Sequence, residues 1–164
     1  MAFRIAIAAL GIALFAAPAR ATDTKAEIDF VTRASNANLF AIAESRLALD
    51  HATDPRLTAF ARRMIDEHET TEAALGPAAS GSGVTVPMTL DPDHQARVAM
   101  LRATFGAPFD KAYVADQAEN HSNALTLYAD YMLLGEDAGL KAFATTMIPV
   151  AEAQFKAAQA LSAE

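Results

Sequence analysis

Two histidines, His68 and His121, are the side chains of this sequence best suited to do chemistry. Each lies on the apolar stripe of a predicted helix, about 15 residues from the turn of its own helical hairpin, so both are expected near the middle of a bundle. Glu44, Glu67 and Glu72 are the carboxylates predicted to lie near them. Two imidazoles with one or two carboxylates suit Fe, Zn, Cu or Mn. The pattern therefore predicts a transition-metal site drawn from these five residues.

A second interpretation of the same histidines needs no metal. Asn38, Gln117 and Gln154 also lie on inward faces, and antiparallel pairing of the first two predicted helices places Asn38 level with His68. Buried polar side chains are nearly always hydrogen-bonded, so a cluster of two imidazoles and three amides can satisfy itself. The alternative prediction is a buried polar cluster that only shapes the packing.

The sequence lacks the motifs of the common enzyme classes. No P-loop, dinucleotide-binding glycine motif, H-E-x-x-H or G-x-S-x-G is present, and no cysteine is available for thiolate chemistry. A di-iron centre in a helical bundle needs Glu-x-x-His pairs, but Ile65 precedes His68 and Ala118 precedes His121 at that spacing. We therefore predict no catalytic residue and no organic cofactor, and favour a binding or structural role over an enzymatic one.

Composition and periodicity indicate an all-α fold. Alanine is abundant, no segment alternates with period two, and Asp54-Pro55 and Asp91-Pro92 each join a capping residue to a proline suited to a first helical turn. Short turns make two antiparallel hairpins, and the longer connection between them holds one short helix. This arrangement is the ferritin-like variant of the four-helix bundle. The helices are predicted at residues 24–51, 55–79, 91–104 (short), 109–134 and 138–161.

An internal repeat supports two related hairpins. Residues 57–65 and 140–148 are identical at six of nine positions, at an offset of 83. The shared leucine, phenylalanine, methionine and isoleucine matter more than the alanines, which coincide easily in such helices. Applied to the other helices, the same offset places Asn38 and His121 at equivalent positions. We therefore expect a duplicated hairpin and approximate two-fold symmetry.

The N-terminus has the layout of a secretory signal. An apolar run, Ile5–Ala17, follows an early positive charge, and Ala19 and Ala21 supply the small residues of an A-x-A cleavage site. We predict a signal peptide at 1–21 and one mature domain at 22–164. An uncleaved N-terminal anchor is the alternative. The expected location is the bacterial periplasm.

The charge balance excludes two classes of partner. Removal of the predicted signal leaves 11 basic and 20 acidic residues, a net charge of −9. Such a surface is unsuited to nucleic acid and to anionic membranes. No later segment is long and apolar enough to be predicted as a membrane span. A protein partner or a homo-oligomer stays open.

The distribution of these residues resembles a known family. The shared pieces are Phe30 and Leu47-Ala48 in the first helix, Phe60-Ala61-x-x-Met64-Ile65-x-x-His68 in the second, Phe109-Asp110-x-x-Tyr113-x-x-x-Gln117-x-x-x-His121 in the fourth and Pro149 in the last. Over about 29–161 the chain resembles the DUF4142 family of exported, ferritin-like bacterial proteins of unknown function. The resemblance implies the fold and export, and it supplies no activity.

Two departures from the family pattern bear on a metal site. The resemblance implies a glutamate near the position of Ala41 or Ala43, whereas the nearest acid here is Glu44. It also implies a histidine five residues after the last-helix proline, where this chain has Gln154. The two hypotheses from the sequence are therefore a metal-binding protein for sequestration or stress protection, and a non-catalytic structural or protein-interaction module.

Overall fold

The computed structural model describes residues 24–162, and these form five α-helices and no strand. The all-α prediction is confirmed. The predicted signal peptide at 1–21 lies outside the described residues. Within 24–162, no helix is long and apolar enough to cross a membrane. The helices are α1 (Thr24–His51), α2 (Pro55–Ala79), α3 (Pro92–Arg102), α4 (Gly106–Leu134) and α5 (Ala138–Ser162).

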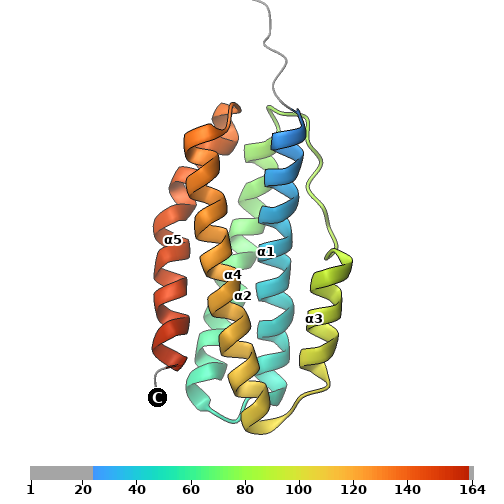
Figure 1. The fold of residues 1–164 in the computed structure, drawn as a ribbon, viewed down its shortest axis with the longest axis vertical. Helices are drawn as coiled ribbons and strands as arrows, with labels where there is room; N and C mark the ends of the chain where they lie inside the picture. Colours follow the sequence, from blue (N-terminus) through green and yellow to red (C-terminus); the bar gives the residue numbers. More distant parts are fainter. Residues whose placement is uncertain (1–23, 163–164) are drawn as a thin grey trace, which may run out of the picture.

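The four long helices lie side by side, and the short helix α3 lies outside them (Figure 1). The most extensive contacts join α1 to α2 and α4 to α5, the two predicted hairpins. Further contacts join α1 to α4 and α2 to α5, so the hairpins pack face to face. Helix α3 packs mainly on α1 and touches α4 only lightly. One side of α4 is therefore left partly uncovered next to α3.

The helix starts follow from local chemistry. The Asp54 side chain accepts a hydrogen bond from the backbone N–H of Arg56, and Asp91 does the same for His94. Both caps satisfy N–H groups that a first turn leaves unpaired. Helix α4 begins at Gly106, three residues earlier than predicted. Pro108 falls in its first turn, where the missing N–H costs nothing, so this proline does not delay the helix.

The apolar core has two halves with a polar layer between them. Along each long helix the two sets of apolar residues occupy opposite ends, and the buried histidines and amides lie in the gap. Burying a large apolar side chain contributes roughly 1.5–3 kcal/mol, so these halves carry most of the stability. One half includes Phe30, Leu75, Tyr128, Leu140 and Phe143, and the other includes Leu57, Phe60, Met64, Phe109 and Tyr113.

The internal repeat has a counterpart in this core. Leu57 and Phe60 anchor one half, and their equivalents Leu140 and Phe143 anchor the other, with all four side chains buried. Helices α1 and α4 meet where the Asn120 side chain donates to the Ala37 carbonyl at 3.0 Å, a pair separated by the repeat offset of 83 residues. Ala37 and Asn120 therefore occupy equivalent positions of the two repeats. A two-fold axis between α1 and α4 would bring such equivalent positions into contact.

Candidate functional site

The two histidines meet at the centre of the polar layer. His68 Nε2 lies 3.1 Å from His121 Nε2, and the rings stack with centroids 5.3 Å apart and planes inclined by 20°. Helix α2 supplies His68 one turn after the buried Met64, and α4 supplies His121 one turn after Gln117. Both imidazoles are buried, His121 fully. The structure thus brings together the two residues on which the predicted site depends.

A chain of hydrogen bonds orients His68 through Nδ1, the ring nitrogen that does not face His121. Its Nδ1 lies 3.0 Å from Asn38 Oδ1, and Asn38 Nδ2 donates to Glu72 at 3.0 Å. Ser35 donates to the other Glu72 oxygen at 2.8 Å. Because the Asn38 amide faces Glu72 with its NH₂, its carbonyl must accept from His68, which places the His68 proton on Nδ1. His68 therefore presents the lone pair of Nε2 to His121.

Burial keeps both imidazoles neutral. Desolvation lowers the pKa of His68 to about 4. Desolvation, with a contribution from His68, lowers the pKa of His121 to about 3. The Gln117 backbone acts in the opposite direction and raises this pKa. His121 Nδ1 is nevertheless buried without a hydrogen bond of good geometry. A neutral imidazole with a free lone pair is the form that binds metals.

Each predicted carboxylate contacts an amide. Glu44 accepts from Gln117 at 3.0 Å, Glu67 accepts from Gln154 at 2.9 Å, and Glu72 accepts from Asn38. Over residues 24–162, no three His, Cys, Asp or Glu side chains converge as a metal-ligand group. Among these amides, Asn38 links a carboxylate to an imidazole, because it contacts both Glu72 and His68.

Among the acids of this layer, Glu44 has the pKa that departs most from its ordinary value. It is fully buried, and desolvation, with the charge of nearby Asp116, raises its pKa to about 10. Arg97 opposes this shift only in part, because it forms an ion pair with Asp116. Glu44 is thus a neutral carboxylic acid at neutral pH. Sequence reasoning missed Asp116 and Arg97, because only the packing of α3 on α1 and α4 brings them near Glu44.

A very small cavity adjoins His68 on the α5 side. Its volume of about 10 Å³ approaches the space that one water molecule or ion occupies. Asn38, His68, Met147 and Gln154 are among its lining residues, together with Tyr128. Met147 therefore places a thioether, a soft metal ligand, at the same cavity as an imidazole. The sequence pattern places Met147 on the inward face of the last helix, but it was not among the predicted metal ligands, because helical spacing does not show which side chains share a cavity with His68.

Three comparisons relate the chain to known proteins. A family model described as a domain of unknown function, DUF4142, matches residues 13–161. No protein with a curated description matches the sequence. The Cu(II)-bound form of CopM matches with a TM-score of 0.67 and 18% identity, covering 83% of this chain and 95% of that chain. The Ag-bound and Cu(I)-bound forms of CopM each match with a TM-score of 0.64 and 18% identity, covering 82% of this chain and 93% of theirs. At this identity the likeness concerns the fold.

Proposed function

The chain belongs to the DUF4142 family, and we propose that it is an exported protein that binds a soft transition-metal ion between His68 and His121. Its role is sequestration of the metal or protection against metal stress. We interpret its two hairpins as a ferritin-like bundle located in the periplasm. The single observation that carries the proposal is the approach of two neutral Nε2 atoms to 3.1 Å.

The spacing of the two nitrogens suits a shared ion. Metal–nitrogen bonds of about 2.0–2.1 Å at a tetrahedral angle place two ligand nitrogens roughly 3.3 Å apart. The observed 3.1 Å therefore needs only a small outward movement of one ring. The Asn38 carbonyl already accepts a hydrogen bond from His68 Nδ1–H, and metal-binding histidines usually donate their other ring N–H in this way.

One proton shift prepares the second ligand. In the metal-free hydrogen bond, His121 Nε2–H donates to the His68 lone pair, which leaves His121 Nδ1 as a buried acceptor without a hydrogen bond. Moving that proton to Nδ1 gives His121 the tautomer that presents an Nε2 lone pair. The Gln117 backbone favours a proton on this ring. Both histidines can then bind one cation without a change in net protonation.

The ligand set favours a soft or borderline metal. Glu44, Glu67 and Glu72 are engaged by amides, so the carboxylates that Fe or Mn would need are not assembled at the pair. Met147 lies beside the same cavity as His68 and offers sulfur as a third donor. Imidazole and thioether together suit Cu(I). The likeness in fold to Cu- and Ag-bound CopM supports this choice.

One observation favours the alternative, a structural or protein-interaction module. As a hydrogen-bonded pair, the histidines join Asn38, Glu72 and Ser35 in a continuous network that needs no ion. Such a network specifies one packing of α1, α2 and α4. In this case the histidines contribute to stability, and the function lies on the surface.

Metal titration of untagged protein separates the two functions. Under reducing, oxygen-free conditions, Cu(I) competed against a chromophoric chelator should bind at one ion per chain. A His68→Gln, His121→Gln variant should lose this binding, whereas His51→Gln should keep it because His51 lies at the end of α1 beside Thr104. Met147→Leu should weaken Cu(I) and Ag(I) binding at least tenfold and leave Zn(II) binding little changed.

The outcomes are distinct. Wild-type protein that binds no Cu(I), Ag(I) or Zn(II) while the double variant changes only stability supports the packing network. A double variant that is folded by circular dichroism and still binds one Cu(I) as tightly as wild type would falsify the assignment of the histidines. Equal losses of Cu(I) and Zn(II) in Met147→Leu would refute the thioether as a ligand.

A further inference from the structure

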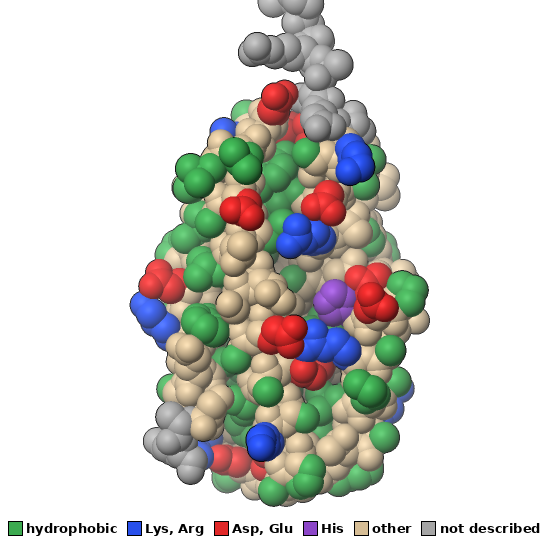
Figure 2. Space-filling view, in the orientation of Figure 1, with side chains coloured by type: hydrophobic (Ala, Val, Ile, Leu, Met, Phe, Trp, Pro, Cys, Tyr) green, Lys and Arg blue, Asp and Glu red, His purple; other side chains and the backbone are tan. Residues whose placement is uncertain are grey.

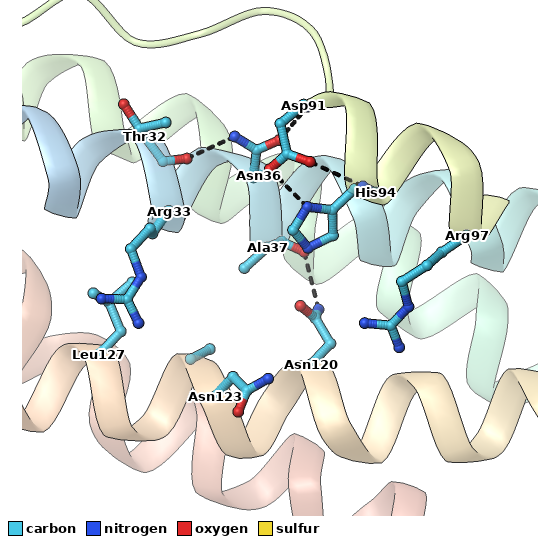
Figure 3. A pocket seen from close by; sticks show the side chains of 11 residues that line it. Thr32, Arg33, Asn36, Ala37, Asp91, His94, Arg97, Asn120, Asn123 and Leu127 are labelled. Atoms are coloured by element: carbon cyan, nitrogen blue, oxygen red, sulfur yellow. Dashed lines mark hydrogen bonds and ion pairs between the residues drawn. The ribbon is translucent and has the colours of Figure 1, made fainter.

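A second cavity lies on the other side of α1, where α3 and α4 fail to close against each other. Its volume is about 350 Å³, at the lower end of the range typical of small-molecule sites. Helices α1, α3 and α4 each contribute side chains to it (Figure 3). In Figure 2 the face between α4 and α3 carries basic and acidic side chains around a surface histidine. We call this cavity the α1–α3–α4 groove.

Two guanidinium groups reach into the groove from opposite ends. Arg33 extends from α1 and Arg97 from α3 (Figure 3). Arg33 has one exposed ion pair, with Asp29 at 3.4 Å. Arg97 uses a single nitrogen, Nη2, for its ion pairs with Asp116 and Glu119. Because a guanidinium has five N–H donors, both arginines keep donors available for a bound group.

Neutral polar groups lie between the arginines. Asn120 is held by its hydrogen bond to the Ala37 carbonyl, which leaves its own carbonyl oxygen free as an acceptor. Asn123 faces the groove from the next turn of α4 (Figure 3). His94 is oriented by Asp91, whose carboxylate lies 2.8 Å from Nδ1, so Nε2 is the nitrogen left for a ligand. The groove thus offers fixed donors and acceptors from two walls.

Both arginines of the groove already form ion pairs, Arg33 with Asp29 and Arg97 with Asp116 and Glu119. The charged residues that line the groove itself are these two arginines and one aspartate. That aspartate, Asp91, is engaged with His94 and with the first turn of α3. The groove therefore favours a carboxylate ligand through the unused N–H donors of its two guanidinium groups, and not through an excess of positive charge.

From this arrangement we propose that the α1–α3–α4 groove binds a small dicarboxylate, one carboxylate at Arg33 and the other at Arg97. The planar fork of a guanidinium matches a carboxylate with two parallel hydrogen bonds, which gives direction as well as attraction. The amides and His94 then contact the carbon chain and any hydroxyl groups on it. The site is separate from the histidine pair and does not depend on the metal.

Isothermal titration calorimetry on metal-free protein tests the proposal, with succinate and malate as probes at constant ionic strength. Both should bind saturably at one molecule per chain. Arg33→Gln and Asn123→Ala change exposed side chains, so the fold should persist, and each should weaken binding at least fivefold. Arg46→Gln is the matched control, because it removes the same charge from an exposed position of the same helix, where Arg46 pairs with Glu69.

Four results decide the matter. Saturable binding of succinate that is weakened by Arg33→Gln and unchanged by Arg46→Gln supports the site. The absence of saturable binding by both probes overturns it. Equal weakening by Arg33→Gln and Arg46→Gln overturns it as well, because general attraction to the surface then accounts for the heat. Inorganic phosphate that binds as tightly as succinate overturns the assignment to dicarboxylates.

Discussion

Replacing Glu44 with glutamine should remove a loss of stability that the wild-type protein shows as the pH rises from about 7 to 9. Glu44 is fully buried and its pKa is raised from 4.5 to about 10, first by desolvation and then by the charge of Asp116. Between these pH values the folded state keeps the proton, while the unfolded chain has released it. Raising the pH therefore favours the unfolded state.

The size of this stability loss follows from the one proton that Glu44 keeps in the folded state and releases on unfolding. Each pH unit in this window costs about 1.4 kcal/mol of unfolding free energy, so two units cost roughly 2.7 kcal/mol. Glutamine has the shape of the protonated acid and can retain the contact with Gln117, which now donates to Glu44 at 3.0 Å. The unfolding free energy of the variant should therefore change little between pH 7 and 9. It should also be more stable than wild type at the alkaline end.

Urea denaturation followed by far-UV circular dichroism measures this difference at several pH values. The control is Glu69→Gln, which removes an exposed carboxylate paired with Arg46 and should keep the wild-type slope. The reasoning is refuted if wild type loses less than about 0.5 kcal/mol between pH 7 and 9, or if Glu44→Gln retains the full slope.

Two further predictions concern the histidine pair. Burial lowers the pKa of His68 to about 4 and that of His121 to about 3, below the ordinary 6.5, so the free energy of unfolding should fall as the pH drops from about 6.5 to 4, by up to about 2.7 kcal/mol per pH unit. Urea denaturation midpoints should show this fall. A His68→Gln, His121→Gln variant that retains the same fall would contradict the assignment to these histidines. Asn38→Ala leaves His68 Nδ1 and one Glu72 oxygen without their partner, so it should cost about 1–3 kcal/mol in urea denaturation. If the pair binds Cu(I), the same change should weaken binding roughly 10–100-fold in the chelator competition, and an unchanged affinity would exclude a supporting role for Asn38.

Local signals in the sequence were enough to locate the helices. Asp54-Pro55 and Asp91-Pro92 act through side-chain caps and the fixed backbone of proline, which depend on neighbours along the chain. The one clear error, the start of α4 at Gly106, came from treating Pro108 as a break. A proline is tolerated in a first turn, and sequence alone does not say which turn is first.

The two histidines could also be predicted, because their spacing from the hairpin turns places both at mid-bundle. Their partners could be predicted less well. Glu44, Glu67 and Glu72 were predicted as candidate ligands from the sequence, and in the structure each accepts a hydrogen bond from an amide on another helix. Helical periodicity gives the face on which a side chain lies, but a difference of one rotamer decides which neighbour it touches.

What the sequence determined by itself is therefore the all-helical fold, the repeat and the inward positions of His68 and His121, since helical spacing and capping are local. The packing of the helices brings the two Nε2 atoms together and places Met147 and His68 at one cavity. This packing also decides that Arg33 and Arg97 face one groove. These relations depend on how α1, α3, α4 and α5 pack, and packing joins residues far apart in the chain through contacts that no local pattern encodes.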